Sequence, residues 1–174
     1  GAMAAVLGAA YPDVFAAVGV HSGVPTGTAN DVLSALAVMR GETGPGAGPQ
    51  GLLVPLIVFH GDADTVVHPM NGERLAAAGI KSGAPRAGRG TAGGREFRRW
   101  VEQSDAGAAL ECWLVAGAGH AWSGGDPSGS FADAEGPDAS AEMVRFFLGT
   151  DSRVWTAHQQ RTDTRAGSNG REAT

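Results

Sequence analysis

The apolar run within "LLVPLIVFHGDAD" (52–64) constrains the fold of this chain more strongly than any other segment. Its hydrophobic residues do not alternate with polar ones, and the run ends at Gly61, just before two aspartates. A strand that is apolar on both sides belongs in the middle of a parallel sheet, where helices cover both faces. The run therefore predicts a central parallel strand, and with it an α/β fold.

The rest of the chain supplies the alternating helices and strands that such a fold needs. Apolar spacing and cap residues predict helices at 2–11, 30–39, 71–83 and 140–149. Apolar runs bounded by turn residues predict further strands at 16–23, 95–103 and 109–117. The Gly-rich segments expected to form loops are 41–51 and 83–94. The prediction is an α/β fold with a mainly parallel sheet flanked by helices.

Composition predicts one folded unit followed by a tail. The chain has 174 residues, of which 43% are hydrophobic, and this is enough for one domain with a real core. All the expected elements lie within residues 1–149. Residues 150–174 are polar and have little to bury, so we expect them to be mostly disordered.

Charge and hydropathy argue against several kinds of partner. The formal net charge is -5 and no block of basic residues occurs, which argues against a nucleic-acid partner. No apolar run approaches the roughly 18 residues that span a bilayer. The single cysteine, Cys112, lies in an apolar run, so it forms no disulfide within the chain and is expected to be a buried thiol.

The first candidate for chemistry is the segment "FHGDADTVVHP" (59–69), which follows the predicted central strand. Open α/β sheets place their ligand sites at the ends of such strands. Asp62 or Asp64 could orient a histidine and stabilise its imidazolium. An Asx turn, in which the carboxylate binds nearby backbone N–H groups, explains the same residues at least as well.

The second candidate is "VAGAGHAWSGG" (115–125), which follows the strand predicted at 109–117. Its histidine, His120, lies on a Gly-rich loop and could act as a general base. A strand-end aspartate followed by a strand-end histidine matches the order Ser, Asp, His of the α/β-hydrolases. A lone loop histidine is more often a surface residue. The hypothesis that His120 is a general base therefore depends on its pairing with the aspartate.

That order requires a serine nucleophile on a G-x-S-x-G elbow before Asp64, and the sequence contains no such elbow. Ser22 has Val20 in place of the first glycine and does not lead into a helix, so we expect it to border the site rather than to attack. Ser123 lies on the same loop as His120 and is an equally poor candidate.

These motifs resemble the poly(3-hydroxybutyrate) depolymerase-like esterases, a branch of the α/β-hydrolases. The family's nucleophile segment reads like G-x-S-A-G-G-A-M, and "GAM" at the start of this chain resembles its end. The similarity continues through "YPDVFAAVGVHSG", "PLIVFHGDADTVVHP" and "GAGHAWSGG". "GHAWSGG" is the more specific of these, because many α/β-hydrolases share H-G-x-x-D.

The resemblance implies a serine esterase (a carboxylic ester hydrolase) that needs neither a metal nor an organic cofactor. It assigns Asp64 as the triad acid and His120 as the base, with Trp122, Ser22 and His21 as residues lining the substrate site. The serine is expected three residues before Gly1. The 174-residue chain by itself is therefore expected to be an inactive fragment of an active parent.

The resemblance further implies an ester substrate, from a polyester, a polysaccharide ester or a small ester, and an extracellular or periplasmic location. Three other hypotheses remain open: a prolyl-oligopeptidase-like serine peptidase, a non-catalytic binding protein on a hydrolase scaffold, and a metal site. The metal site would use the spacing H-x-D-x-D-x-x-x-H, formed by His60, Asp62, Asp64 and His68. In the esterase, His60 is expected to be structural.

Overall fold

The computed structural model describes residues 1–44, 46, 54–79, 85–104 and 107–149. The tail predicted at 150–174 lies outside the described residues. The helices are α1 (Ala2–Ala10), α2 (Val32–Met39), α3 (Met70–Ala78) and α4 (Ala139–Phe147). The strands are β1 (Val18–His21), β2 (Leu56–Gly61), β3 (Arg86–Ala92), β4 (Arg95–Ser104), β5 (Gly107–Val115), β6 (Trp122–Ser123) and β7 (Ala132–Asp133).

The predicted central strand and all four predicted helices are confirmed, but the helix predicted at 71–83 ends at Ala78, and residues 80–83 lie outside the described residues. Every residue of β2 is buried, and β2 lies between β1 and β5 as their parallel neighbour. α2 begins with a capping box in which Asp31 accepts a hydrogen bond from the backbone N–H of Ser34. α4 is followed by Gly149 in the left-handed region, at φ 65°, as expected for a glycine that ends a helix.

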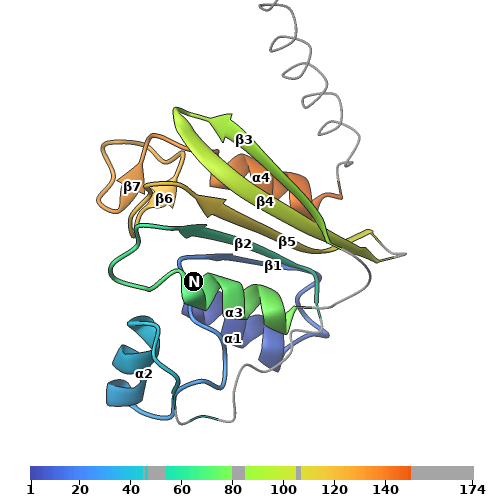
Figure 1. Ribbon diagram of the computed structural model, residues 1–174. Coiled ribbons are helices and arrows are strands. Elements are labelled where there is room, and N and C mark those ends of the chain that lie inside the picture. The colour runs from blue at the N-terminus through green and yellow to red at the C-terminus, as the bar shows by residue number, and fades with distance from the viewer. Residues whose placement is uncertain (45, 47–53, 80–84, 105–106, 150–174) are drawn as a thin grey trace, which may run out of the picture.

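The sheet is mixed, which corrects the prediction of a mainly parallel one. Its five strands run in the order β1-β2-β5-β4-β3. The first three are parallel, whereas β4 is antiparallel to both β5 and β3 (Figure 1). Only Gly93 and Gly94 separate β3 from β4, and a connection this short can join only antiparallel strands.

The loop predicted at 83–94 is wrong over 86–92, where the chain forms the edge strand β3. The side chains of β3 are exposed or only partly covered, so its sequence does not need the alternation of apolar and polar residues that marks a half-buried strand. Its backbone instead pairs residue by residue with β4. Gly90 fits this pairing, since a Cβ there would lie 2.7 Å from the ring of Phe97.

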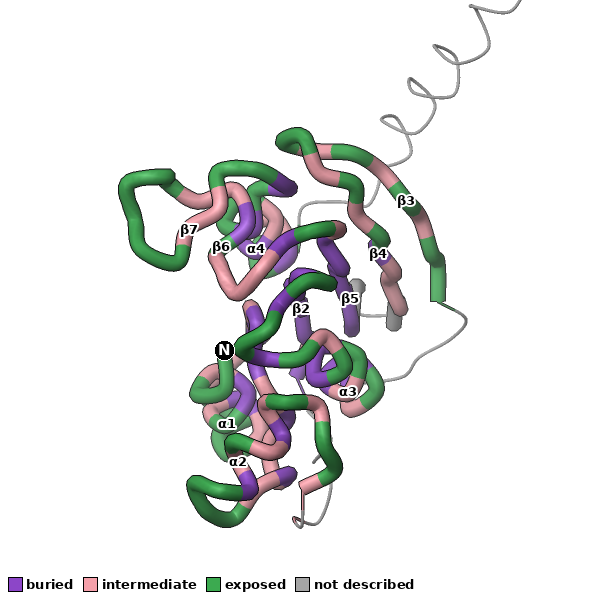
Figure 2. The backbone as a smooth tube through the Cα atoms, turned by 60° about the vertical axis from the view of Figure 1, so that its left-hand side comes forward, coloured by how far each residue is buried: buried purple, intermediate pink, exposed green. Residues whose placement is uncertain are grey.

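Two apolar cores cover the two faces of the sheet. Alternate residues of β2 serve both: Leu56 and Val58 point to one face, and Ile57 and Phe59 to the other. α1 and α3 pack on the first face and α4 on the second (Figure 1). Figure 2 shows that burial is concentrated in the central strands. The loops that carry Asp64 and His120 therefore follow buried strands.

A buried charge network lies on the α4 side of the sheet. Glu111, on β5, is 1% exposed and accepts hydrogen bonds from Nε and Nη2 of Arg99, at 2.9 and 2.8 Å. The indole N–H of Trp113 and a guanidinium N–H of Arg145 also donate to Glu111. The network thus ties β4, β5 and α4 together through one carboxylate.

Candidate functional site

Asp64 uses its two carboxylate oxygens for two different tasks. Oδ1 accepts hydrogen bonds from the backbone N–H groups of Val66 and Val67, at 3.0 and 2.8 Å, which closes the turn after β2. Oδ2 lies 2.9 Å from Nδ1 of His120. Asp64 therefore both forms the Asx turn and orients the histidine, because the turn holds its carboxylate in place for the imidazole.

His120 reaches Asp64 from the loop after β5. Its imidazole is 30% exposed, whereas the Asp64 carboxylate is 0% exposed. The structure shows no hydrogen bond to Nε2 among the described residues, so this nitrogen is available to a reacting group. A buried acid, an oriented imidazole and an accessible second nitrogen form the arrangement of a general base.

Asp62 has a different partner. Its Oδ1 accepts a hydrogen bond from the backbone N–H of Gly117, at 2.7 Å, and so anchors the start of the His120 loop. Gly117 adopts a positive φ of 68°, which a glycine tolerates without strain. The geometry therefore separates the two aspartates: Asp64 contacts the imidazole, and Asp62 contacts the loop.

The environment of Asp64 favours its charged form. Burial by itself raises the pKa of this carboxyl, but hydrogen bonds from Val67, His120, Ser22 and Val66 outweigh it and hold the pKa below its ordinary value. An ionised Asp64 keeps the proton of His120 on Nδ1 and leaves the lone pair of Nε2 facing outward.

His60 is part of the same turn. Its Nε2–H donates to the carbonyl oxygen of Val67, at 2.8 Å, and lies 3.5 Å from Oδ2 of Asp64. The four residues of the H-x-D-x-D-x-x-x-H spacing do not converge, because Asp62 binds Gly117 and His68 accepts from the N–H of Met70. In the described part of the chain, no group of three His, Cys, Asp or Glu residues is arranged to hold a metal ion.

The remaining expected site residues lie around His120. The ring of His21 stacks on that of Trp122, with centroids 4.9 Å apart. Trp122 is 38% exposed, and its indole N–H donates to Oγ of Ser140, at 3.0 Å. Ser22 is buried at the end of β1, and Ser123 turns its hydroxyl to the carbonyl of Pro137, away from the imidazole.

Phe131 is a site residue that the sequence analysis missed. Its ring meets the His120 ring edge-on at a centroid distance of 6.3 Å, and it is 74% exposed. Its φ of 64° is unusual for a bulky residue. The pairing of β6 with β7 holds it there, and its carbonyl accepts the N–H of Trp122 at 2.7 Å. A lone aromatic in a polar loop gives no signal of such a contact.

Gly61 allows the two site loops to approach each other. A Cβ at this position would lie 2.1 Å from the carbonyl oxygen of Ala118, which is backbone and cannot rotate away. We expect Gly61→Ala to destabilise the protein by about 1–3 kcal/mol, as measured by urea denaturation. Gly119→Ala is the matched control, because a Cβ there meets nothing within 4 Å. Equal effects of the two substitutions would contradict this interpretation.

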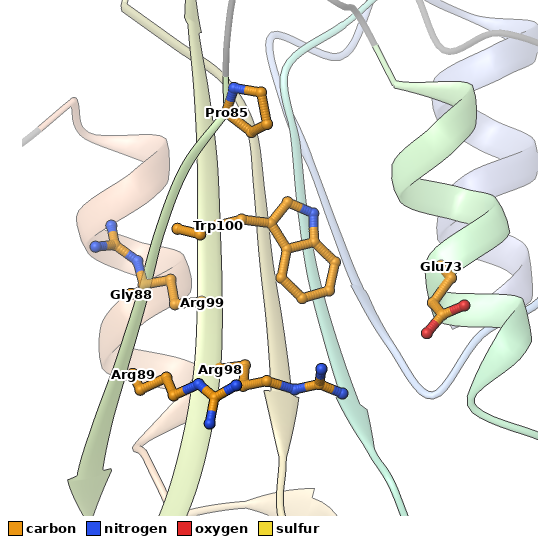
Figure 3. A pocket seen from close by; sticks show the side chains of 8 residues that line it. Glu73, Pro85, Gly88, Arg89, Arg98, Arg99 and Trp100 are labelled. Carbon is orange, nitrogen blue, oxygen red and sulfur yellow. The ribbon is translucent and has the colours of Figure 1, made fainter.

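A hollow of about 520 Å³ lies elsewhere, between β3, β4 and α3. Figure 3 shows Trp100 and Arg98 on the strand side, with Glu73 on α3 opposite, whereas the side chain of Arg99 points away toward α4. Neither Asp64 nor His120 lines it. The chemistry of the Asp64–His120 pair is therefore separate from this hollow.

One comparison with known proteins identifies a family. The sequence model of the family described as Esterase PHB depolymerase matches residues 1–101, which include Asp64. A comparison with curated proteins finds no match. None of the described helices is long and apolar enough to cross a membrane. The match covers more than half of the 174 residues and confirms the resemblance inferred from the motifs, so the chain belongs to the Esterase PHB depolymerase family.

Proposed function

We propose that this chain carries the acid and the base of a serine esterase, with Asp64 as the acid and His120 as the base. The observation that carries the proposal is the 2.9 Å contact between Oδ2 of Asp64 and Nδ1 of His120. Family membership supports an ester as the substrate. Phe131 meets the His120 imidazole edge-on, and Trp122 stacks on His21. Both side chains are exposed and offer apolar surface to that substrate.

In the proposed reaction, Nε2 of His120 takes the proton of a serine hydroxyl as the serine oxygen attacks the ester carbonyl. The tetrahedral oxyanion collapses, the ester C–O bond breaks, and the alcohol leaves with the proton from Nε2. Water then gives a proton to Nε2 and attacks the acyl-serine. The acid is released and the serine regains its proton. Asp64 stabilises the imidazolium in both halves of the reaction.

The serine is proposed to lie three residues before Gly1 in the full-length protein, as in the family's G-x-S-A-G-G-A-M segment. Gly1 supports this placement because it packs on the end of β1: a Cβ there would lie 2.5 Å from the carbonyl oxygen of His21. α1 follows Gly1 directly, so a serine three residues before Gly1 would lie on the N-terminal side of this helix. Such a terminus favours negative charge.

Labelling with a fluorophosphonate, which phosphonylates activated serines, tests this proposal. In the full-length protein, mass spectrometry should find the label on the serine before Gly1, and hydrolysis of p-nitrophenyl acetate should stop. The 174-residue chain should neither react nor hydrolyse the ester. A label on Ser22 or Ser123 would overturn the placement of the nucleophile, and full activity of the 174-residue chain would overturn it as well.

A further inference from the structure

A second set of polar contacts joins the His120 loop to Asp64 from behind the imidazole. The backbone N–H of Ser123 lies 3.1 Å from Nε2 of His21. A backbone N–H can only donate a hydrogen bond, so Nε2 of His21 must be the acceptor and carry no proton. The proton of the neutral ring is therefore on Nδ1.

This tautomer determines the direction of the next contact. Nδ1 of His21 lies 3.3 Å from Oγ of Ser22, so the ring N–H donates and the hydroxyl accepts. The hydroxyl proton of Ser22 is then free to be donated, and the Ser22 side chain is one of the groups that hold the pKa of the Asp64 carboxyl below its ordinary value. An ionised carboxylate can only accept. All the donors therefore point the same way, from the loop towards Asp64.

His21 is held rigidly in this position. Its ring stacks on Phe59 and Trp122, with interplanar angles of 9° and 23°. Burial, with smaller contributions from His60, His120 and the amino group of Gly1, lowers the pKa of His21 to about 4 against the opposing effect of Asp64. The ring is therefore neutral at ordinary pH, as the contact with Ser123 requires.

The backbone of Ser22 is strained. Its φ is 48°, in the left-handed region that is unfavourable for a serine and that a glycine adopts without cost. Its N–H donates to the carbonyl of Phe59, at 2.9 Å, and this bond holds the residue on the neighbouring strand. The side chain of Ser22 begins from this fixed backbone position, next to His21.

We propose that His21 and Ser22 are positioning residues, which transmit a one-way chain of hydrogen bonds from Ser123 to Asp64 and so fix the acid and the His120 loop relative to each other. Together with the contact between Asp64 and His120, the chain closes a ring of interactions. The assignment of its purpose rests on the proposed esterase function. The tautomer of His21 and the direction of the hydrogen bonds do not depend on that function.

The tautomer is tested by ¹⁵N NMR of the histidines. We expect the spectrum of His21 to show a protonated Nδ1 and a bare Nε2 from pH 5 to 8. A proton on Nε2 would overturn the proposal, because Ser123 could not then donate to that nitrogen. This measurement needs no enzymatic activity, so it remains decisive even if the esterase proposal fails.

The hydroxyl of Ser22 is tested in the full-length protein with Ser22→Ala and Ser22→Gly. Both should raise the pKa of Asp64, followed by the ¹³C signal of its carboxylate, because a hydrogen bond to the charged form is lost. Both should lower kcat for p-nitrophenyl acetate by about 10–100-fold with little change in KM. Ser34→Ala is the matched control, since Ser34 is as buried as Ser22 but lies on α2, and kcat should not change.

The imidazole of His21 is tested with His21→Phe, which preserves the stacking and removes both nitrogens. We expect kcat to fall as far as in Ser22→Ala. Retention of wild-type kcat within twofold in either variant would overturn the positioning role. If the unmodified full-length protein hydrolyses no ester, the esterase proposal fails instead, while the NMR results still decide the hydrogen-bond chain.

Discussion

Replacing Asp64 by asparagine in the full-length protein is expected to lower kcat for ester hydrolysis by about ten-thousandfold. The amide has nearly the same shape as the carboxylate, so the fold should persist. It has no negative charge to stabilise the imidazolium, and its NH₂ group can donate to Nδ1 of His120. The imidazole would then carry its proton on Nε2, where it cannot accept the proton of the serine. Steady-state hydrolysis of p-nitrophenyl acetate measures the effect.

Asp62→Asn is the matched control, because Asp62 lies two residues away and binds the N–H of Gly117 instead of the imidazole. We expect its kcat to stay within tenfold of the unmodified protein. His120→Ala should be at least as damaging as Asp64→Asn, and the double variant no worse than His120→Ala, because groups that act as a unit are not additive. An Asp64→Asn variant with more than a tenth of full activity would exclude Asp64 as the triad acid.

Glu111→Gln is expected to lower the free energy of unfolding by about 3–5 kcal/mol. Arg99 is 5% exposed, and its guanidinium would remain buried beside a neutral amide. Arg145 would lose the charge of its second carboxylate partner but would keep Glu142. Urea denaturation of the variant and the unmodified protein measures the difference.

The control for this prediction is Glu42→Gln. Glu42 pairs with Arg40 at 3.0 Å, but both side chains are more than half exposed, so the change should stay within about 0.5 kcal/mol. A loss below about 1 kcal/mol for Glu111→Gln would mean that the buried network adds little.

The contribution of Glu111 should depend on pH. Burial raises the pKa of Glu111, but Arg99 and Arg145 outweigh this effect and hold the pKa below its ordinary value. A carboxyl whose pKa is lower in the folded state stabilises the protein fully above the unfolded value of about 4.3. That stabilisation is lost as the pH falls through the folded value. The difference between Glu111→Gln and the unmodified protein should therefore shrink in acid.

Local patterns in the sequence were sufficient for much of the fold. The apolar run of β2 predicted a strand buried on both faces, and cap residues predicted helices such as α2, with Asp31 at its start. These elements are encoded by neighbouring residues. The strand β3 was missed because its formation depends on backbone pairing with β4 rather than on its own side chains. For the same reason, the sheet is less parallel than predicted.

The candidate site, like the fold, was predicted only in part from the sequence. The motifs around Asp64 and His120 singled out both residues from the sequence, although 56 positions separate them. The local pattern left Asp62 and Asp64 open, and only the family resemblance favoured Asp64. The sequence could not decide between a turn and a contact with the histidine. In the structure, one oxygen of Asp64 closes the turn and the other meets the imidazole.

By itself, the sequence determined the central strand, the helices, the family and the residue types available for catalysis, because each depends on a short motif or on spacing along the chain. Only the tertiary structure decided which atoms meet: Phe131 against His120, Ser123 against His21, and two arginines around Glu111. These contacts join segments that strand order and register bring together. Their energies depend on distance and burial, which no local pattern encodes.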